Sequence, residues 1–188
     1  MKIAIALLSA TAAITLPAYV FAADQSATID SSSQYKDNGG YSTSATAKST
    51  DANGTETTAK QSEDVDVDNN GDKTTHVKKV TTVNPKGSNN DQKTVSDVTT
   101  QQKANGNYSK SVTNKNLNGG GTDVTTKSNT DVKVDPQGNV TKTTDTEKTV
   151  DPKTGLFSAQ TTSTKTKTVN GQVVDEQKQA PAPDNSAQ

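Results

Sequence analysis

Apolar and polar positions alternate along residues 122–135, TDVTTKSNTDVKVD. One alternate set is β-branched apart from one serine: Thr122, Val124, Thr126, Ser128, Thr130, Val132 and Val134. The other set is mostly charged or amide-bearing, and this period of two predicts a strand with one half-buried face. Residues 161–169, TTSTKTKTV, alternate in the same way. The sequence shows no sustained apolar stripe of helical period, and Thr, Val, Asn, Asp and Gly are poor helix formers.

Turn signals separate the predicted strands. They end in Gly54, Gly71, Gly87, Gly106, Gly120, Gly138, Gly155 and Gly171, each preceded by Asn, Asp or Pro within four residues. Proline presets one dihedral angle, Asx side chains cap the bend, and glycine takes the positive φ. The glycines are spaced by 17, 16, 19, 14, 18, 17 and 16 residues. This spacing predicts strand-turn units of about 17 residues.

One phrase also occurs twice. SEDVDVDNNGD begins at Ser62, and NTDVKVDPQGN begins at Asn129, which is 67 residues later and equals four units. A fixed period indicates repeat architecture. We therefore expect an all-β repeat, either an elongated antiparallel meander or a β-solenoid, with disordered ends. The alternative is a largely intrinsically disordered chain, because this composition offers little to bury.

The chain divides into four predicted segments. Residues 1–22 form a signal peptide, since Lys2 precedes an apolar run, Pro17 breaks it, and small residues lead to cleavage at Ala22. Residues 23–50 are a flexible polar leader, 51–175 the strand-turn repeat region, and 176–188 a disordered tail with a Pro-Ala-Pro stretch. No later apolar segment is long enough for a bilayer span, so no membrane span is expected after cleavage.

Composition limits the core. Residues 23–188 contain 16 Val, two Leu, one Ile and one Phe, about 12% of the segment, which is below the level at which a packed core is expected. The chain has no cysteine, so it cannot add the disulfides that strengthen small secreted domains. Its stability must come from a regular hydrogen-bonded ladder or from contacts with copies of itself.

Catalytic chemistry is not expected. The chain has one histidine, no cysteine and no arginine, and general acid catalysis needs a carboxyl group in a desolvated pocket. His76, among lysines in KTTHVKK, is expected to face solvent. Lysines are interspersed with carboxylates and aromatic residues are few, which also argues against nucleic-acid binding. We expect no enzyme, no catalytic residue and no cofactor-binding residue.

A weak calcium signal is present in residues 66–71, DVDNNG. It matches the start of an EF-hand loop, in which Asp66, Asp68 and Asn70 would supply oxygen ligands. The twelfth position, where a bidentate glutamate belongs, is Val77. A plain hairpin turn is the favoured interpretation, and calcium is kept as the one candidate cofactor.

These features favour a secreted, non-enzymatic structural or adhesive repeat protein of a bacterial envelope or extracellular matrix. Open sheet edges predict pairing with another copy or with cell-envelope components. The expected location is exported: periplasmic, cell-surface or extracellular. The alternatives are a ligand-binding repeat protein, for calcium or for ice through threonine arrays such as Thr162, Thr164, Thr166 and Thr168, and a disordered periplasmic spacer.

Overall fold

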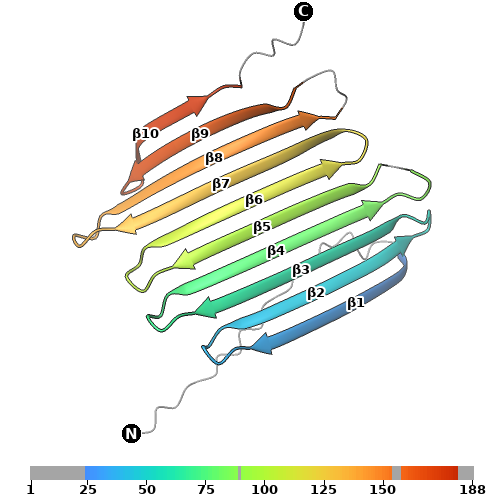
Figure 1. Cartoon of the computed structure of the whole chain (residues 1–188), viewed down its shortest axis with the longest axis horizontal. Helices are drawn as coiled ribbons and strands as arrows, with labels where there is room; N and C mark the ends of the chain where they lie inside the picture. Colours follow the sequence, from blue (N-terminus) through green and yellow to red (C-terminus); the bar gives the residue numbers. More distant parts are fainter. Residues whose placement is uncertain (1–23, 89, 154–157, 182–188) are drawn as a thin grey trace, which may run out of the picture.

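Ten β-strands make up the regular structure in the computed structural model, which describes residues 24–88, 90–153 and 158–181 (Figure 1). The strands are β1 (Asp24–Tyr35), β2 (Tyr41–Asp51), β3 (Glu56–Val67), β4 (Lys73–Asn84), β5 (Gln92–Gln102), β6 (Tyr108–Asn118), β7 (Thr122–Val134), β8 (Val140–Pro152), β9 (Gln160–Val169) and β10 (Gln172–Gln179). Among these described residues, no helix has the length and apolar character needed to span a membrane.

The strands form one open sheet in the order β1 to β10, and each pairs antiparallel with its neighbours in the chain (Figure 1). The predicted antiparallel meander is therefore confirmed, and the solenoid alternative is wrong. The two copies of the repeated phrase take equivalent places. The first ends β3 and forms the turn into β4, and the second ends β7 and forms the turn into β8. The repeat of 67 residues thus corresponds to four strands of the sheet.

Five of the hairpin turns share one hydrogen-bond pattern, as the turn from Asp135 to Asn139 illustrates. The N–H of Asp135 donates to the Asn139 carbonyl at 3.0 Å, and the N–H of Gly138 donates to the Asp135 carbonyl at 2.9 Å. Gly138 has φ 83°, so the loop is a type I turn followed by a left-handed residue. The same pair of bonds closes the turns at 36–40, 51–55, 68–72 and 103–107.

The register separates the two faces of the sheet. We call one the Val/Thr face, because it carries twelve strand valines: Val65, Val67, Val77, Val83, Val98, Val112, Val124, Val132, Val134, Val140, Val150 and Val173. The other, which carries Asp64, His76, Asp97 and Asp145, is the carboxylate face; its valines are Val80, Val95 and Val169. The alternation predicted for residues 122–134 is confirmed, and these threonines and valines all lie on the Val/Thr face.

Buried side chains are few and lie together. They are Ala45, Ala47, Ser49, Ala59, Gln61 and Val65, all on the Val/Thr face of β2 and β3. The described strands form a single layer in which the strand contacts run between chain neighbours. The ladder of backbone hydrogen bonds, rather than a packed interior, is what the strands themselves provide.

The predicted ends of the fold need correction. The flexible leader predicted for residues 23–50 is wrong, because β1 and most of β2 occupy it. Gly39 has φ 83° and is a turn glycine like those further along. The predicted tail begins too early, since β10 continues to Gln179. The predicted signal peptide with its cleavage at Ala22, and residues 182–188 of the tail, lie outside the described residues.

Candidate functional site

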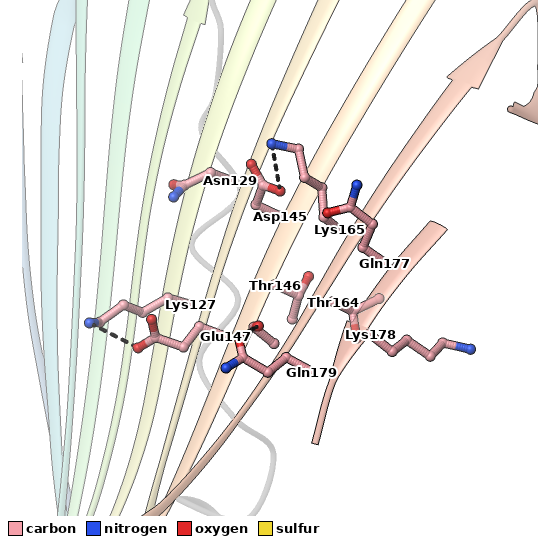
Figure 2. A pocket seen from close by; sticks show the side chains of 11 residues that line it. Lys127, Asn129, Asp145, Thr146, Glu147, Thr164, Lys165, Gln177, Lys178 and Gln179 are labelled. Atoms are coloured by element: carbon pink, nitrogen blue, oxygen red, sulfur yellow. Dashed lines mark hydrogen bonds and ion pairs between the residues drawn. The ribbon is translucent and has the colours of Figure 1, made fainter. Parts of the chain in front are cut away.

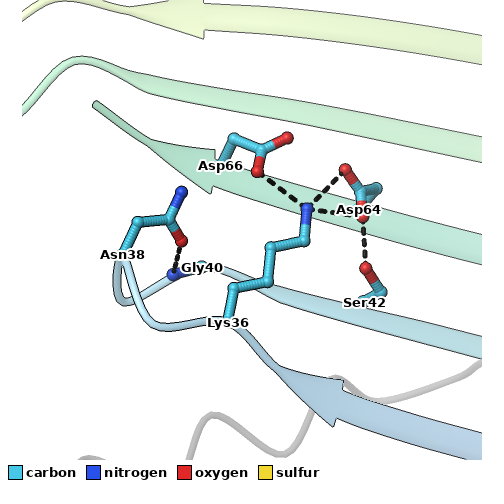
Figure 3. Close-up of polar contacts among 6 residues, drawn as sticks. All are labelled: Lys36, Asn38, Gly40, Ser42, Asp64 and Asp66. Carbon is cyan, nitrogen blue, oxygen red and sulfur yellow. Dashed lines mark hydrogen bonds and ion pairs between the residues drawn. The ribbon is translucent and has the colours of Figure 1, made fainter.

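A lysine in the first turn joins two aspartates of β3 (Figure 3). Nζ of Lys36 donates to Asp64 and to Asp66 at 2.8 Å each, and the Ser42 hydroxyl also donates to Asp64. The hydrogen bonds from Lys36 and then Ser42 lower the pKa of Asp64. The hydrogen bonds from Nζ to Asp64 and then to Asp66 raise the pKa of Lys36. The cluster ties the β1–β2 turn to β3, two strands away from β1.

Two of the three candidate calcium ligands have other partners. Asp66 accepts from Lys36 on the carboxylate face. Oδ1 of Asp68 accepts hydrogen bonds from the backbone N–H groups of Asn70 and Asp72, at 2.8 and 2.9 Å, and so caps the turn. Across the described ranges, no group of three or more His, Cys, Asp or Glu side chains is arranged to hold a metal ion. Asp68 and Asn70 thus act within the hairpin turn, which is the interpretation that the sequence favoured.

His76 lies on the carboxylate face of β4, and its side chain is 47% exposed, consistent with the solvent-facing position expected. Its Nε2 is 2.8 Å from Oδ1 of Asp97 on β5. The sequence did not indicate this partner, because the two residues are 21 positions apart and meet only through the β4–β5 register. One histidine with one exposed carboxylate lacks the nucleophile or third group that a catalytic triad requires.

A depression on the sheet surface lies over β7 to β10 (Figure 2). Two ion pairs line it: Lys127–Glu147 at 3.4 Å and Lys165–Asp145 at 3.8 Å. Both carboxylates are about half exposed. Water therefore reaches them, whereas general acid catalysis needs a carboxyl group in a desolvated pocket. The depression is suited to weak, reversible polar contacts.

Hydroxyl groups line up across β7, β8 and β9 on the Val/Thr face. Ser128 faces Thr146 with oxygens 3.2 Å apart, and Thr130 faces Thr144 at 3.3 Å. The threonines predicted on β9 extend these rows, since Thr164 is opposite Thr146 and Thr166 is opposite Thr144. Lys142 and Lys148 interrupt the array on β8, on the same face. A flat uncharged array, which the ice-binding alternative requires, is therefore limited to a small area.

Charge is divided unequally between the faces. Within the strands, the Val/Thr face has the lysines Lys73, Lys79, Lys110, Lys142, Lys148 and Lys178, and the carboxylates Asp51, Glu63 and Glu176. Asp51 caps its turn, and Glu63 accepts from Tyr41 at 2.7 Å. The carboxylate face carries more charge of both signs, with nine strand lysines and eleven strand carboxylates. Several of these carboxylates lie beside a cationic or histidine partner, among them Asp64, Asp97, Asp145 and Glu147. The Val/Thr face is thus the more positive of the two.

The sheet has two open edges, β1 and β10. The edge strands carry four of the six large hydrophobic side chains that are exposed among the described residues: Ile29 at 55%, Tyr35 at 65%, Val173 at 63% and Val174 at 56%. Exposed apolar groups on an unpaired edge are typical of a surface that pairs with another strand. Sequence reasoning missed the β1 edge because it placed this segment in a flexible leader.

Comparison with known proteins gives no relative. No family model, no curated protein and no solved structure matches the chain. The functional interpretation therefore rests on the sheet itself.

Proposed function

We propose that the chain is an exported, non-enzymatic structural or adhesive protein of a bacterial envelope or extracellular matrix. The observation that carries this proposal is the open sheet of the described strands, which has two unpaired edges and buries only six side chains, all on one face of β2 and β3. Such a sheet offers large contact surfaces for its length. It has little desolvated volume in which to organise a reaction.

Its surface chemistry supports the adhesive role. Exposed lysines and hydroxyl groups on the Val/Thr face can bind anionic and hydroxyl-rich envelope polymers through many weak contacts. The apolar edge residues add strand pairing as a second mode of attachment. The signal-peptide pattern of residues 1–22 supports export.

Cell fractionation tests this proposal. In cells that make the chain, immunodetection should find it outside the cytoplasm and bound to the envelope or matrix, and cells without it should adhere less. Deleting residues 3–16, the apolar run of the signal pattern, should retain it in the cytoplasm. Accumulation of the intact chain in the cytoplasm, or unchanged adhesion without it, would contradict the proposal.

A further inference from the structure

We propose that copies of this chain join head to tail, with β10 of one copy pairing antiparallel with β1 of the next. The inference rests on the proposed structural function and names the partner as a second copy. It follows from three features of the sheet: the composition of the edges, the even number of strands, and the end of the sheet at which the exposed apolar groups lie.

The β1 edge lacks the devices that usually prevent strand pairing. Natural edge strands carry lysines, prolines or bulges, or are short. β1 is 12 residues long, and its sequence DQSATIDSSSQY contains neither lysine nor proline. Its register with β2 is regular from Ser26 to Tyr35. β10 is shorter, with eight residues, and it carries Lys178 and a register irregularity between Val173 and Asp175, but Asp175–Gln179 is regular again. Both edges can therefore accept a further strand.

The strand number makes copies related by translation compatible. Because neighbouring strands are antiparallel and there are ten, β1 and β10 run in opposite directions. A second copy shifted sideways in the plane of the sheet thus places its β1 antiparallel to β10, with its Val/Thr face on the same side. The join repeats the pairing found throughout the chain, and each addition leaves the same two edges open. Such a non-closing contact generates a filament.

The rows of paired residues indicate where the two strands meet. The row that begins at Tyr35 on β1 runs through opposed residues to Glu176 on β10, all on the Val/Thr face: Tyr35, Tyr41, Val65, Thr75, Thr100, Lys110, Thr130, Thr144, Thr166 and Glu176. Val173 lies in the next row on the same face, opposite Thr168. Continuing the straight row into the next copy puts its Tyr35 diagonal to Val173. A register shifted by two residues puts Tyr35 directly opposite Val173. An aromatic side chain can contact its neighbour in either register.

Two-fold pairing does not achieve this contact. Tyr35 ends β1 and Val173 is near the start of β10, so both lie at the same end of the sheet. Pairing β1 with β1 of another copy reverses one strand, and it brings Tyr35 beside the Asp24 end. Pairing β10 with β10 brings Val173 beside the Gln179 end. Head-to-tail pairing alone places exposed apolar groups from both edges together.

Cysteine crosslinking tests the proposal directly, because the chain has no cysteine of its own. The exported protein carrying Tyr35→Cys and Val173→Cys, treated with an oxidant or a short bismaleimide, should give a ladder of covalent multimers. Each single variant should give no covalent multimers, because only one of the two joined edges carries a thiol. The control pair is Tyr35→Cys with Val140→Cys. It keeps the thiol on β1 and moves the second thiol from the edge strand β10 to the first residue of the inner strand β8. This pair should give no ladder.

Other outcomes would overturn the inference. Dimers from a single variant indicate two-fold pairing, and monomers from the double variant under both reagents indicate no pairing. Sedimentation of the unsubstituted chain tests the same inference if the cysteine variants fail to fold. The mass of the sedimenting species should increase with protein concentration. A monomeric chain that still binds the envelope contradicts this inference and leaves the proposed function intact. A filament that stays in the cytoplasm contradicts the proposed function and leaves this inference intact.

Discussion

The hydroxyl of Tyr41 on β2 donates a hydrogen bond of 2.7 Å to Oε1 of Glu63 on β3. The two residues are diagonal neighbours on the Val/Thr face, because Tyr41 is opposite Val65 and Glu63 is opposite Thr43. This hydrogen bond, followed by burial of the phenol, raises the pKa of Tyr41 from 10.0 to about 12. Ionisation would remove the donor and place two negative charges together.

Glu63→Gln should lower the pKa of Tyr41 toward its ordinary value, as measured by the ultraviolet absorbance of tyrosinate against pH. Because the folded-state pKa is raised, the contact stabilises the fold fully below pH 10 and is lost as pH rises through about 12. Tyr41→Phe removes this phenol, so it shows which part of the absorbance change comes from Tyr41. Glu56→Gln, on the other face of the same strand, should leave the titration unchanged, and an unshifted Tyr41 in Glu63→Gln would argue against this contact.

Gly138→Ala should destabilise the sheet by about 1 kcal/mol, because a Cβ at positive φ is strained. The space around this position is open, so the effect is one of backbone conformation alone. Thermal melting followed by circular dichroism measures it. Gly138→Asn should cost less, since asparagine tolerates this region and Asn170 adopts it at φ 49°. Gln137→Ala in the same turn should be near neutral, and equal effects at 137 and 138 would contradict the turn geometry.

Asp135→Asn should reduce the loss of stability in acid. Hydrogen bonds from the Asn139 side chain, then from the Asn139 backbone, lower the pKa of Asp135 below 3.8. A depressed carboxyl pKa adds stability above the ordinary value, and this is lost as pH falls through the folded-state value. Melting temperatures measured from pH 5 downward should therefore fall less in the variant. Asp131→Asn, at an exposed carboxylate of β7 outside the turn, is the matched control for the change in charge.

Lys36→Met should weaken the anchoring of the β1–β2 hairpin to β3. It leaves Asp64 and Asp66 without their shared cation, so the pKa of Asp64 should rise, as carboxyl resonances followed by NMR against pH would show. Amide exchange in β1 and β2 should become faster. Lys48→Met on β2 is the control, and identical exchange in the two variants would mean that the cluster does not hold the hairpin.

Calcium should not bind tightly to residues 64–72. Asp66 faces Lys36, and Asp68 caps its own turn, so neither side chain is free to join a coordination sphere of six to eight oxygens. Isothermal titration should show no micromolar site. Micromolar binding that Asp66→Ala abolishes would overturn this expectation.

Local sequence predicted most of the turns and the strands between 56 and 169. Six of the eight predicted turn glycines have positive φ; Gly120 does not, and Gly155 lies outside the described residues. Glycine and Asx residues specify the bends locally through φ and side-chain capping, and Thr/Val alternation specifies a pleated, one-sided strand. The scarcity of large apolar residues likewise predicted that the chain has little with which to build a core. These are local or compositional properties, and they need no knowledge of partners distant in the chain.

The remaining features depend on pairing between strands. β1 and most of β2 consist largely of Ser, Ala and Thr, whose side chains are too small to mark a buried face. β2 becomes a strand by pairing with β3, and β1 by pairing with β2. The choice of meander over solenoid depends on which backbones hydrogen-bond, and turn spacing is the same for both. The Lys36–Asp64 and His76–Asp97 contacts join residues 28 and 21 positions apart. They exist only because the register of long antiparallel strands brings these side chains to one face.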